Sequence, residues 1–133
     1  MRRKIFMIID DDADDRFVFT STLKEMLSST ECIEADSGEN ALRQLRETEK
    51  LPDFIFLDVN MPLMNGYECL KELKRDKKLQ NIPVIIYSTS FTEQSIKEFR
   101  THGASSYLKK PTDLNKLPEA IIEAIKRPLQ LSC

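Results

Sequence analysis

Five short apolar runs, each followed by a segment with helical periodicity, constrain this chain more than any other feature of its sequence. The runs in the middle of the sequence are unbroken, which is typical of strands covered on both faces of a parallel sheet. The segments between them carry apolar residues three or four positions apart, so each predicts a helix with one apolar stripe. The apolar runs are residues 4–9, 32–35, 54–57, 84–87 and 106–108. Their alternation predicts an α/β fold with a doubly wound parallel sheet of five strands and helices on both faces.

Glycine and proline agree with these boundaries. Gly66 is expected at the start of the third helix, and Gly103 just past the fourth, where a left-handed cap is useful. Pro118 falls within the last helical pattern. Because proline suits the first turn of a helix, we expect residues 113–116 to form a separate turn and the helix to begin near Leu117.

Length and charge indicate one domain that binds neither nucleic acid nor membrane. The 133 residues match the common size of a single domain, which we expect to have a core at about residues 4–127 and a short tail at 128–133. A formal net charge of −2 argues against a phosphate-binding surface for nucleic acid. The first apolar run is too short for a signal peptide or a membrane span, so we expect a cytoplasmic location.

Cysteine and histidine exclude several classes of site. Cys32, Cys69 and Cys133 are irregularly spaced, and with His102 they match no usual zinc spacing or disulfide framework. We expect Cys32 and Cys69 to be small buried hydrophobes or surface thiols. His102, the one histidine, is expected to be structural or exposed, and a hydrolase of the Ser-His-Asp type is not favoured.

Acids, a hydroxyl and amines follow the predicted strands. They are Asp10, Asp11 and Asp12 after the first strand, Asp58 after the third, Ser88 after the fourth, and Lys109 and Lys110 after the fifth. A parallel sheet brings these positions to one edge, where clustered carboxylates repel unless a cation lies among them. Oxygen ligands without sulfur or histidine favour Mg²⁺. Asp58 could then attack a phosphoryl group to form an aspartyl phosphate, and Ser88 could donate a hydrogen bond to it.

Four segments, taken in order, resemble the receiver domains of two-component response regulators. They are MIIDDDADDR at residues 7–16, PDFIFLDVNMPLMNG at 52–66, IPVIIYSTS at 82–90 and GASSYLKKP at 103–111. The resemblance implies a flavodoxin-like sandwich with the strand order 2-1-3-4-5. It also implies a Mg²⁺ site formed by Asp10, Asp11, Asp58 and the backbone carbonyl of Asn60. The remaining implied roles are Asp58 as phosphoacceptor, Ser88 as switch hydroxyl, Lys110 as phosphate-binding amine and Tyr107 as aromatic switch.

The resemblance further implies a cis peptide between Lys110 and Pro111, which a tertiary amide allows at a cost of about 0.5–1 kcal/mol. Two registers remain open from the residues alone. Asp12 is the alternative to the pair Asp10 and Asp11, and Lys109 is read as the solvated neighbour of Lys110. Thr89 replaces the small residue usual in the family, so we expect narrower access to the phosphoryl pocket.

The implied partners are proteins. The resemblance implies a sensor histidine kinase as phosphoryl donor and a downstream protein that binds the face of the fourth helix, fifth strand and fifth helix, at about residues 92–127. The domain would act as a monomer or as an activation-linked dimer. It would catalyse only its own phosphorylation and dephosphorylation, and so it is not expected to be an enzyme. The opening DDADDR resembles receivers that work with phytochrome-type kinases.

Two alternatives remain. A Mg²⁺-dependent phosphohydrolase of the haloacid dehalogenase type would use Asp10 and Asp12 as its DxD pair, although Asp14 stands where that family has a hydroxyl. The second alternative is a pseudo-receiver, a scaffold with the receiver fold that is not phosphorylated. A flavodoxin-like FMN site is excluded, since acids replace the phosphate loop that such a site needs after the first strand.

Overall fold

The computed structural model describes residues 4–59 and 65–126. Within these residues, five strands form one parallel sheet in the order β2-β1-β3-β4-β5. The predicted fold class and strand order are therefore confirmed. The strands are β1 (Lys4–Ile9), β2 (Thr30–Ala35), β3 (Phe54–Asp58), β4 (Val84–Ser88) and β5 (Ser106–Lys109).

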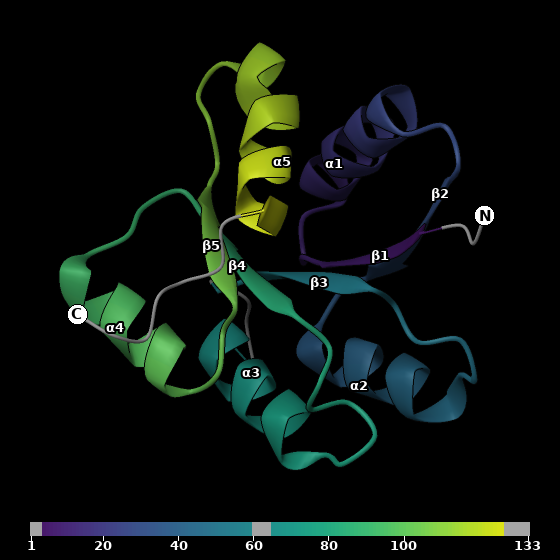
Figure 1. Ribbon diagram of the computed structural model, residues 1–133, viewed down its shortest axis with the longest axis vertical. Coiled ribbons are helices and arrows are strands. Elements are labelled where there is room, and N and C mark those ends of the chain that lie inside the picture. Colours follow the sequence, from purple (N-terminus) through teal and green to yellow (C-terminus); the bar gives the residue numbers. More distant parts are fainter. Residues whose placement is uncertain (1–3, 60–64, 127–133) are drawn as a thin grey trace.

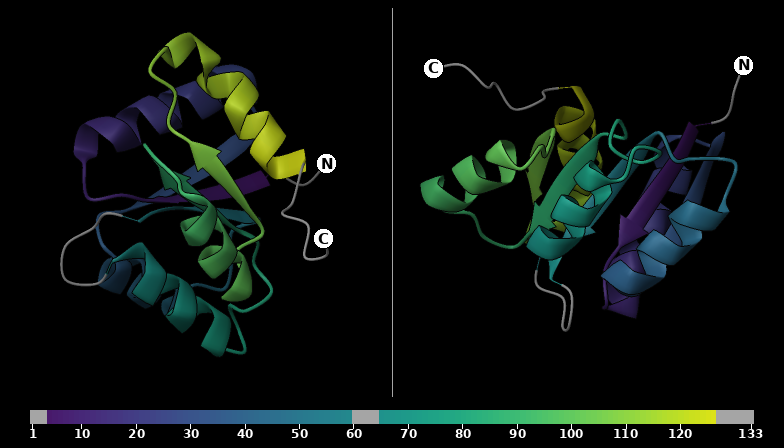
Figure 2. Two further views of the ribbon diagram at one scale, coloured as in Figure 1. Left: turned by 90° about the vertical axis from the view of Figure 1, so that its left-hand side faces the viewer. Right: turned by 90° about the horizontal axis from the view of Figure 1, so that it is seen from below.

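Helices cover both faces of the sheet, as Figures 1 and 2 show. α1 and α5 lie on one face, and α2, α3 and α4 lie on the other (Figure 1). The helices are α1 (Ala13–Met26), α2 (Gly38–Glu47), α3 (Gly66–Arg75), α4 (Glu93–Thr101) and α5 (Leu117–Lys126). The sheet is thus the middle layer of three, as expected for a doubly wound fold.

Each face of the sheet has its own apolar core. Alternate residues of β3 serve the two cores: Phe56 packs under α1 and α5, and Leu57 packs under the opposite helices. Phe19 of α1 contributes to the first core, where its ring lies 4.8 Å from that of Phe56. Both strand residues are completely buried, which explains the unbroken apolar run of this strand.

The ends of the helices are set by local chemistry. Gly103 has φ +100° just past α4, the left-handed conformation that the sequence predicts. A short 3₁₀ helix spans Leu114–Lys116 and is followed directly by α5, so Pro118 lies in the first turn as expected.

One expectation is wrong. No peptide bond between described residues is cis, so Lys110 and Pro111 are joined by a trans peptide bond. The trans form is the one that an X–Pro bond ordinarily favours. Asn60 and the predicted tail at 128–133 lie outside the described residues. Among the described helices, none is long and apolar enough to cross a membrane.

Candidate functional site

The carboxyl ends of four strands bring the predicted site residues together. Asp10 follows β1 and is 1% exposed, while Asp58 ends β3 and is 5% exposed. Ser88 ends β4 and is buried, and its carbonyl accepts a hydrogen bond from the backbone N–H of Lys110 at 2.7 Å. Asp11 is exposed at the rim of the same cluster. The parallel register therefore places the acids, the hydroxyl and the amine at one edge.

The ammonium group of Lys110 lies among three carboxylates. Its Nζ donates to Asp15 Oδ2 at 3.0 Å and to Asp10 Oδ2 at 3.3 Å, and lies 4.0 Å from Asp58 Oδ1. Lys109 is exposed, because β5 alternates and its side chain points to the other face. In the structure, Lys110 and not Lys109 contacts these carboxylates, and the role of Lys110 as phosphate-binding amine stays a prediction.

Burial and neighbouring charges shift the pKa values of Asp10 and Lys110. Burial raises the pKa of Asp10 to about 7, and the charge of Asp58 adds to this rise against the N–H of Asp12 and the ammonium of Lys110. Burial by itself would lower the pKa of Lys110, but the hydrogen bond to Asp15 and the charges of Asp10 and Asp58 raise it above 10.5. Lys110 is therefore held as a cation, and the site still carries more negative charge than one ammonium offsets.

Three residues of this cluster were not predicted from the sequence. The Tyr87 ring lies under the ammonium, with Lys110 Nζ 4.6 Å from its centroid, and Asp15 is the partner described above. Arg16 donates through Nη1 to the carbonyl of Asp10 at 2.7 Å and through Nε to Glu34 at 3.0 Å. Asp15 and Arg16 directly follow the acidic run, in the first turn of the predicted helix, and this position was the sequence signal that could have placed them near the site.

The acidic cluster fits a small divalent cation. Asp10, Asp11 and Asp58 each offer a carboxylate oxygen, and these oxygens lie within 4.8 Å of one another. Two oxygens on opposite sides of Mg²⁺ are about 4.2 Å apart. Small movements of these side chains would therefore bring the three oxygens to one cation. Asn60, the fourth ligand implied by the resemblance, lies outside the described residues.

The two predicted switch residues contact different partners. The Ser88 hydroxyl donates to the carbonyl of Ser90 at 3.1 Å. Tyr107 is 39% exposed, and its ring lies 4.8 Å from that of Phe91. Thr89 is exposed at the end of β4, and its effect on access to the site stays a prediction.

Asp12 is occupied as the N-cap of α1. Its Oδ1 accepts the backbone N–H groups of Asp14 at 2.8 Å and of Asp15 at 3.2 Å. A carboxylate that closes the first turn of a helix is not available as the second member of a catalytic DxD pair with Asp10. This geometry favours the pair Asp10 and Asp11, whose role as metal ligands stays a prediction, and it argues against the phosphohydrolase alternative.

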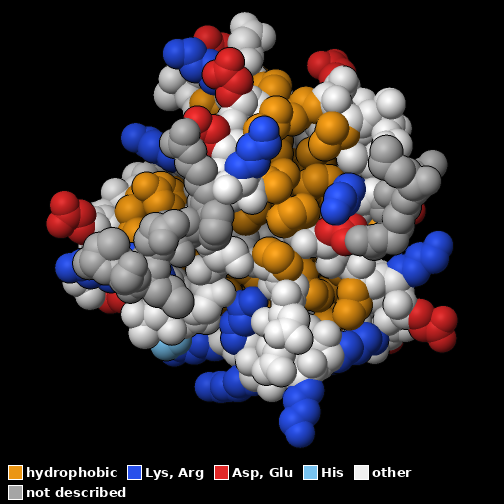
Figure 3. Space-filling view, in the orientation of Figure 1, with side chains coloured by type: hydrophobic (Ala, Val, Ile, Leu, Met, Phe, Trp, Pro, Cys, Tyr) orange, Lys and Arg blue, Asp and Glu red, His pale blue; other side chains and the backbone are white. Residues whose placement is uncertain are grey.

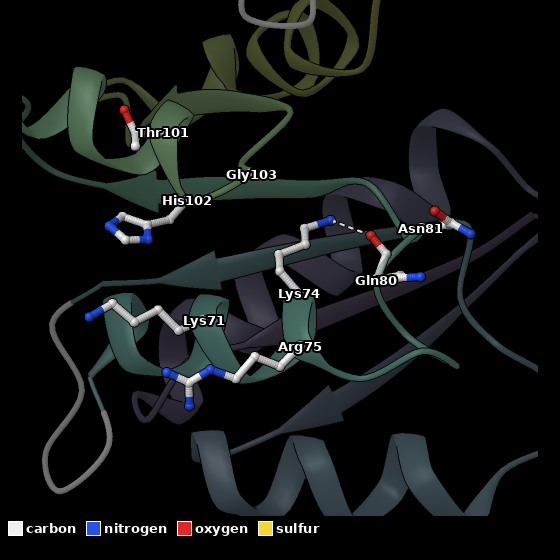
Figure 4. Close-up of a pocket in the computed structure, with 8 residues that line it drawn as sticks. All are labelled: Lys71, Lys74, Arg75, Gln80, Asn81, Thr101, His102 and Gly103. Atoms are coloured by element: carbon white, nitrogen blue, oxygen red, sulfur yellow. Dashed lines mark hydrogen bonds between the residues drawn. The ribbon is translucent and has the colours of Figure 1, made fainter.

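A hollow of about 590 Å³ lies elsewhere, at the amino ends of β4 and β5 and between α3 and the end of α4 (Figure 4). Lys and Arg side chains gather over α3 and the loop after it (Figure 3). The cations that line the hollow already have partners within the chain. These are the carbonyls of Gln80 and Ile82 for Lys74, the Tyr67 ring for Lys71 and the Glu72 carboxylate for Arg75. We therefore place the chemistry at the acidic edge and not in this hollow.

The cysteines and the histidine agree with their expected structural roles. Cys69 is buried and Cys32 half-buried, and burial raises the pKa of each thiol to about 12. Thiols with such a pKa are poor nucleophiles at neutral pH. The His102 ring packs edge-on against Tyr67 at 4.7 Å between centroids. Cys133 lies outside the described residues.

Comparisons with known proteins agree with this geometry. The family model of the response regulator receiver domain matches residues 6–122. The chemotaxis protein CheY of Pseudomonas aeruginosa is 31% identical over 121 residues, which cover 91% of this chain and 95% of that protein. Protein PilH of the same organism is 29% identical over 115 residues, covering 86% of this chain and 92% of PilH.

Some relatives are longer proteins. The chain spans 15% of the sensor histidine kinase CheAY of Helicobacter pylori, at 30% identity over 122 residues. It spans 56% of the two-component response regulator ORR7 of Oryza sativa subsp. japonica, at 32% identity over 120 residues.

Solved structures show the same fold. The phosphorylated cyanobacterial phytochrome response regulator RcpA matches with a TM-score of 0.83 and 28% identity, covering 94% of this chain and 92% of that one. The Mn²⁺-bound form of response regulator Rcp1 matches with a TM-score of 0.80 and 25% identity, covering 98% and 99%. From its sequence motifs, its fold and these matches, the chain belongs to the response regulator receiver domain family.

Proposed function

We propose that Asp58 accepts a phosphoryl group from the phosphohistidine of a sensor histidine kinase. A carboxylate oxygen of Asp58 attacks phosphorus, and the bond between phosphorus and the histidine nitrogen breaks. The electron pair of that bond stays on the imidazole, which takes up a proton. The signal ends by hydrolysis: water attacks phosphorus, the bond between phosphorus and the Asp58 oxygen breaks, and inorganic phosphate leaves. The chain would thus catalyse only its own modification and its reversal.

The neighbours of Asp58 have distinct tasks in this reaction. Lys110, 4.0 Å from Asp58, supplies a fixed positive charge for the phosphoryl oxygens. Asp10, Asp11 and Asp58 would hold Mg²⁺, with the carbonyl of Asn60 as the further ligand suggested by the family. When bound, Mg²⁺ would offset the charge that spreads over the oxygens of the transferred group. Arg16 fixes the loop that carries Asp10 by binding its carbonyl at 2.7 Å.

The same contacts suggest how phosphorylation is sensed. The Ser88 hydroxyl, now bonded to Ser90, would turn to donate to a phosphoryl oxygen. Tyr107 would then leave Phe91 and turn inward, changing the surface of α4, β5 and α5 at about residues 92–127. We propose that a downstream protein binds this surface, and that the chain, residues 1–133, works as one receiver domain. A phytochrome-type kinase is supported as donor because the matching RcpA structure is that of a phytochrome response regulator.

One observation carries the proposal. A carboxylate, a second buried carboxylate and an ammonium group from three strand ends converge within hydrogen-bond or ion-pair distance, namely Asp58, Asp10 and Lys110. No single strand could create this arrangement, since the residues are separated by up to 100 positions in sequence. Such convergence of buried charges is costly to fold and is characteristic of functional sites.

The direct test is the mass of the protein after incubation with acetyl phosphate and Mg²⁺. We expect one phosphoryl increment in the native chain and none in the Asp58→Asn variant. Phosphorylation that persists in Asp58→Asn would refute the assignment of the acceptor. Sustained release of phosphate from many phosphomonoesters would instead support the phosphohydrolase, and no modification by any donor would support the scaffold.

A further inference from the structure

We propose that Asp15 restrains phosphorylation by holding the Lys110 ammonium on the α1 side of the site, away from Asp58. This inference rests on the proposed function, because it concerns the group that would bind the phosphoryl oxygens. It assigns a regulatory role to a residue outside the predicted set of acids, hydroxyl and amine. Asp15 is a positioning residue, since it acts on the reaction only through Lys110.

The distances order the partners of the ammonium group. Nζ of Lys110 lies 3.0 Å from Asp15, 3.3 Å from Asp10 and 4.0 Å from Asp58. The group is thus hydrogen-bonded to the first two carboxylates and only within ion-pair distance of the acceptor. A phosphoryl oxygen on Asp58 would compete with the Asp15 carboxylate for the hydrogen bonds of this ammonium group.

The first turn of α1 places Asp15 where its carboxylate can compete for the Lys110 ammonium group. It lies in the first turn of α1, where its backbone N–H donates to the capping carboxylate of Asp12 at 3.2 Å. The next residue, Arg16, ties this turn to the Asp10 carbonyl and to Glu34 of β2. The Asp15 side chain is 41% exposed, so part of its carboxylate stays in contact with solvent. A carboxylate carried on this helix turn competes with other acceptors for the Lys110 ammonium group.

Two effects of Asp15 act in the same direction. Its hydrogen bond holds the Lys110 ammonium beside α1. Its negative charge also repels a phosphoryl group or other anion that approaches Lys110. Removing the charge while keeping the shape should therefore favour binding of an anion at Asp58. The alternative, that Asp15 prepares Lys110 for the phosphoryl group, predicts the opposite sign.

Asp14 provides a matched control. It is the neighbouring residue in the same first turn of α1, it is exposed, and its backbone N–H binds the same cap at 2.8 Å. Asp14→Asn and Asp15→Asn each remove one negative charge from the start of α1. Among the described residues, only Asp15 of this pair has a recorded ion pair with Lys110. A difference between the two variants therefore reports the contact and not the net charge.

The experiment measures binding of beryllofluoride, a phosphoryl mimic, in the presence of Mg²⁺ by NMR titration of native chain and variants. We expect Asp15→Asn to bind about fivefold more tightly than the native chain, and to be phosphorylated by acetyl phosphate faster by a similar factor. Asp14→Asn should stay within about twofold of the native values. Asp15→Glu, which restores the carboxylate, should return affinity toward the native value. Urea unfolding of each variant checks that affinity changes without a matching loss of stability.

The outcomes separate the two proposals. Equal or weaker binding by Asp15→Asn, or equal gains in both Asn variants, would refute the restraint while leaving Asp58 as acceptor. A crystal structure of Asp15→Asn with Lys110 Nζ no closer to Asp58 than 4.0 Å would refute it as well. If the native chain binds no beryllofluoride and gains no phosphoryl group, the proposed function fails and the restraint fails with it.

Discussion

Gly66 has no Cβ atom, and this allows the backbone of Asp58 to pack directly against the start of α3. A Cβ atom at this residue would lie 2.6 Å from the Asp58 carbonyl oxygen and 2.5 Å from the Cα of Val59. Real Cβ atoms do not approach backbone so closely, so the strand end or the helix start would have to move. The glycine is therefore required by a close approach of α3 to the acceptor.

We expect Gly66→Ala to lower the free energy of unfolding by about 1–3 kcal/mol, because the added methyl overpacks a backbone contact. It should also slow phosphorylation, since the displaced backbone carries Asp58. Urea unfolding and the acetyl phosphate reaction measure the two effects. Native stability together with native rate in this variant would show that the contact is not tight.

Residue identity alone left several choices undecided. The residues alone leave open whether Lys109 or Lys110 faces the acids. In the structure, the Lys110 ammonium contacts three carboxylates. Asp15 and Tyr87 were missed because neither belongs to the pattern of polar residues at strand ends. Their roles come from contacts to Lys110 that join α1, β4 and β5.

At the scale of the element, α1 begins with a cap that also shapes the site. Asp12 accepts two backbone N–H groups, and the same turn presents Asp15 to Lys110. The start of this helix could be predicted from the acidic run before an apolar stripe. The exact capping residue among several acids could not, because each of them is able to cap.

We expect Asp12→Ala to lower the free energy of unfolding by about 1 kcal/mol, since two N–H groups lose their acceptor. Asp12→Asn keeps an acceptor oxygen and should stay close to the native stability. Thermal or urea unfolding of the two variants makes the comparison. If Asp12→Asn instead abolished phosphorylation while preserving the fold, Asp12 would be part of the acidic site, and the register of Asp10 and Asp11 would be wrong.

At the scale of the whole molecule, the buried carboxylates of the acidic site lower the free energy of unfolding. Asp10 is buried beside Asp58, and the Lys110 ammonium, which both approach, does not by itself offset their combined charge. A bound divalent cation relieves this repulsion and, because it binds the folded state, adds stability by mass action.

We expect Mg²⁺ at a hundred times its dissociation constant to stabilise the native chain by about 2.7 kcal/mol at pH 8, and EDTA to remove this gain. Asp10→Asn should be more stable than the native chain in EDTA, by on the order of 1 kcal/mol, because it removes a buried like charge. It should gain less from Mg²⁺. Unfolding curves with Mg²⁺ and with EDTA measure all four states, and an equal gain in both proteins would exclude Asp10 from the cation site.

The sequence by itself determined the layered α/β fold, the five strands, the start of α5 at Leu117 and the edge at which the polar residues meet. These follow from the period of apolar residues and from the rule that parallel strands end on one side. Only the tertiary structure decided that Asp12 caps a helix, that the peptide bond before Pro111 is trans, and that Asp15 binds Lys110. Those outcomes depend on distances of a few ångströms between elements, and the hydrophobic pattern is almost the same whichever acid or lysine makes the contact.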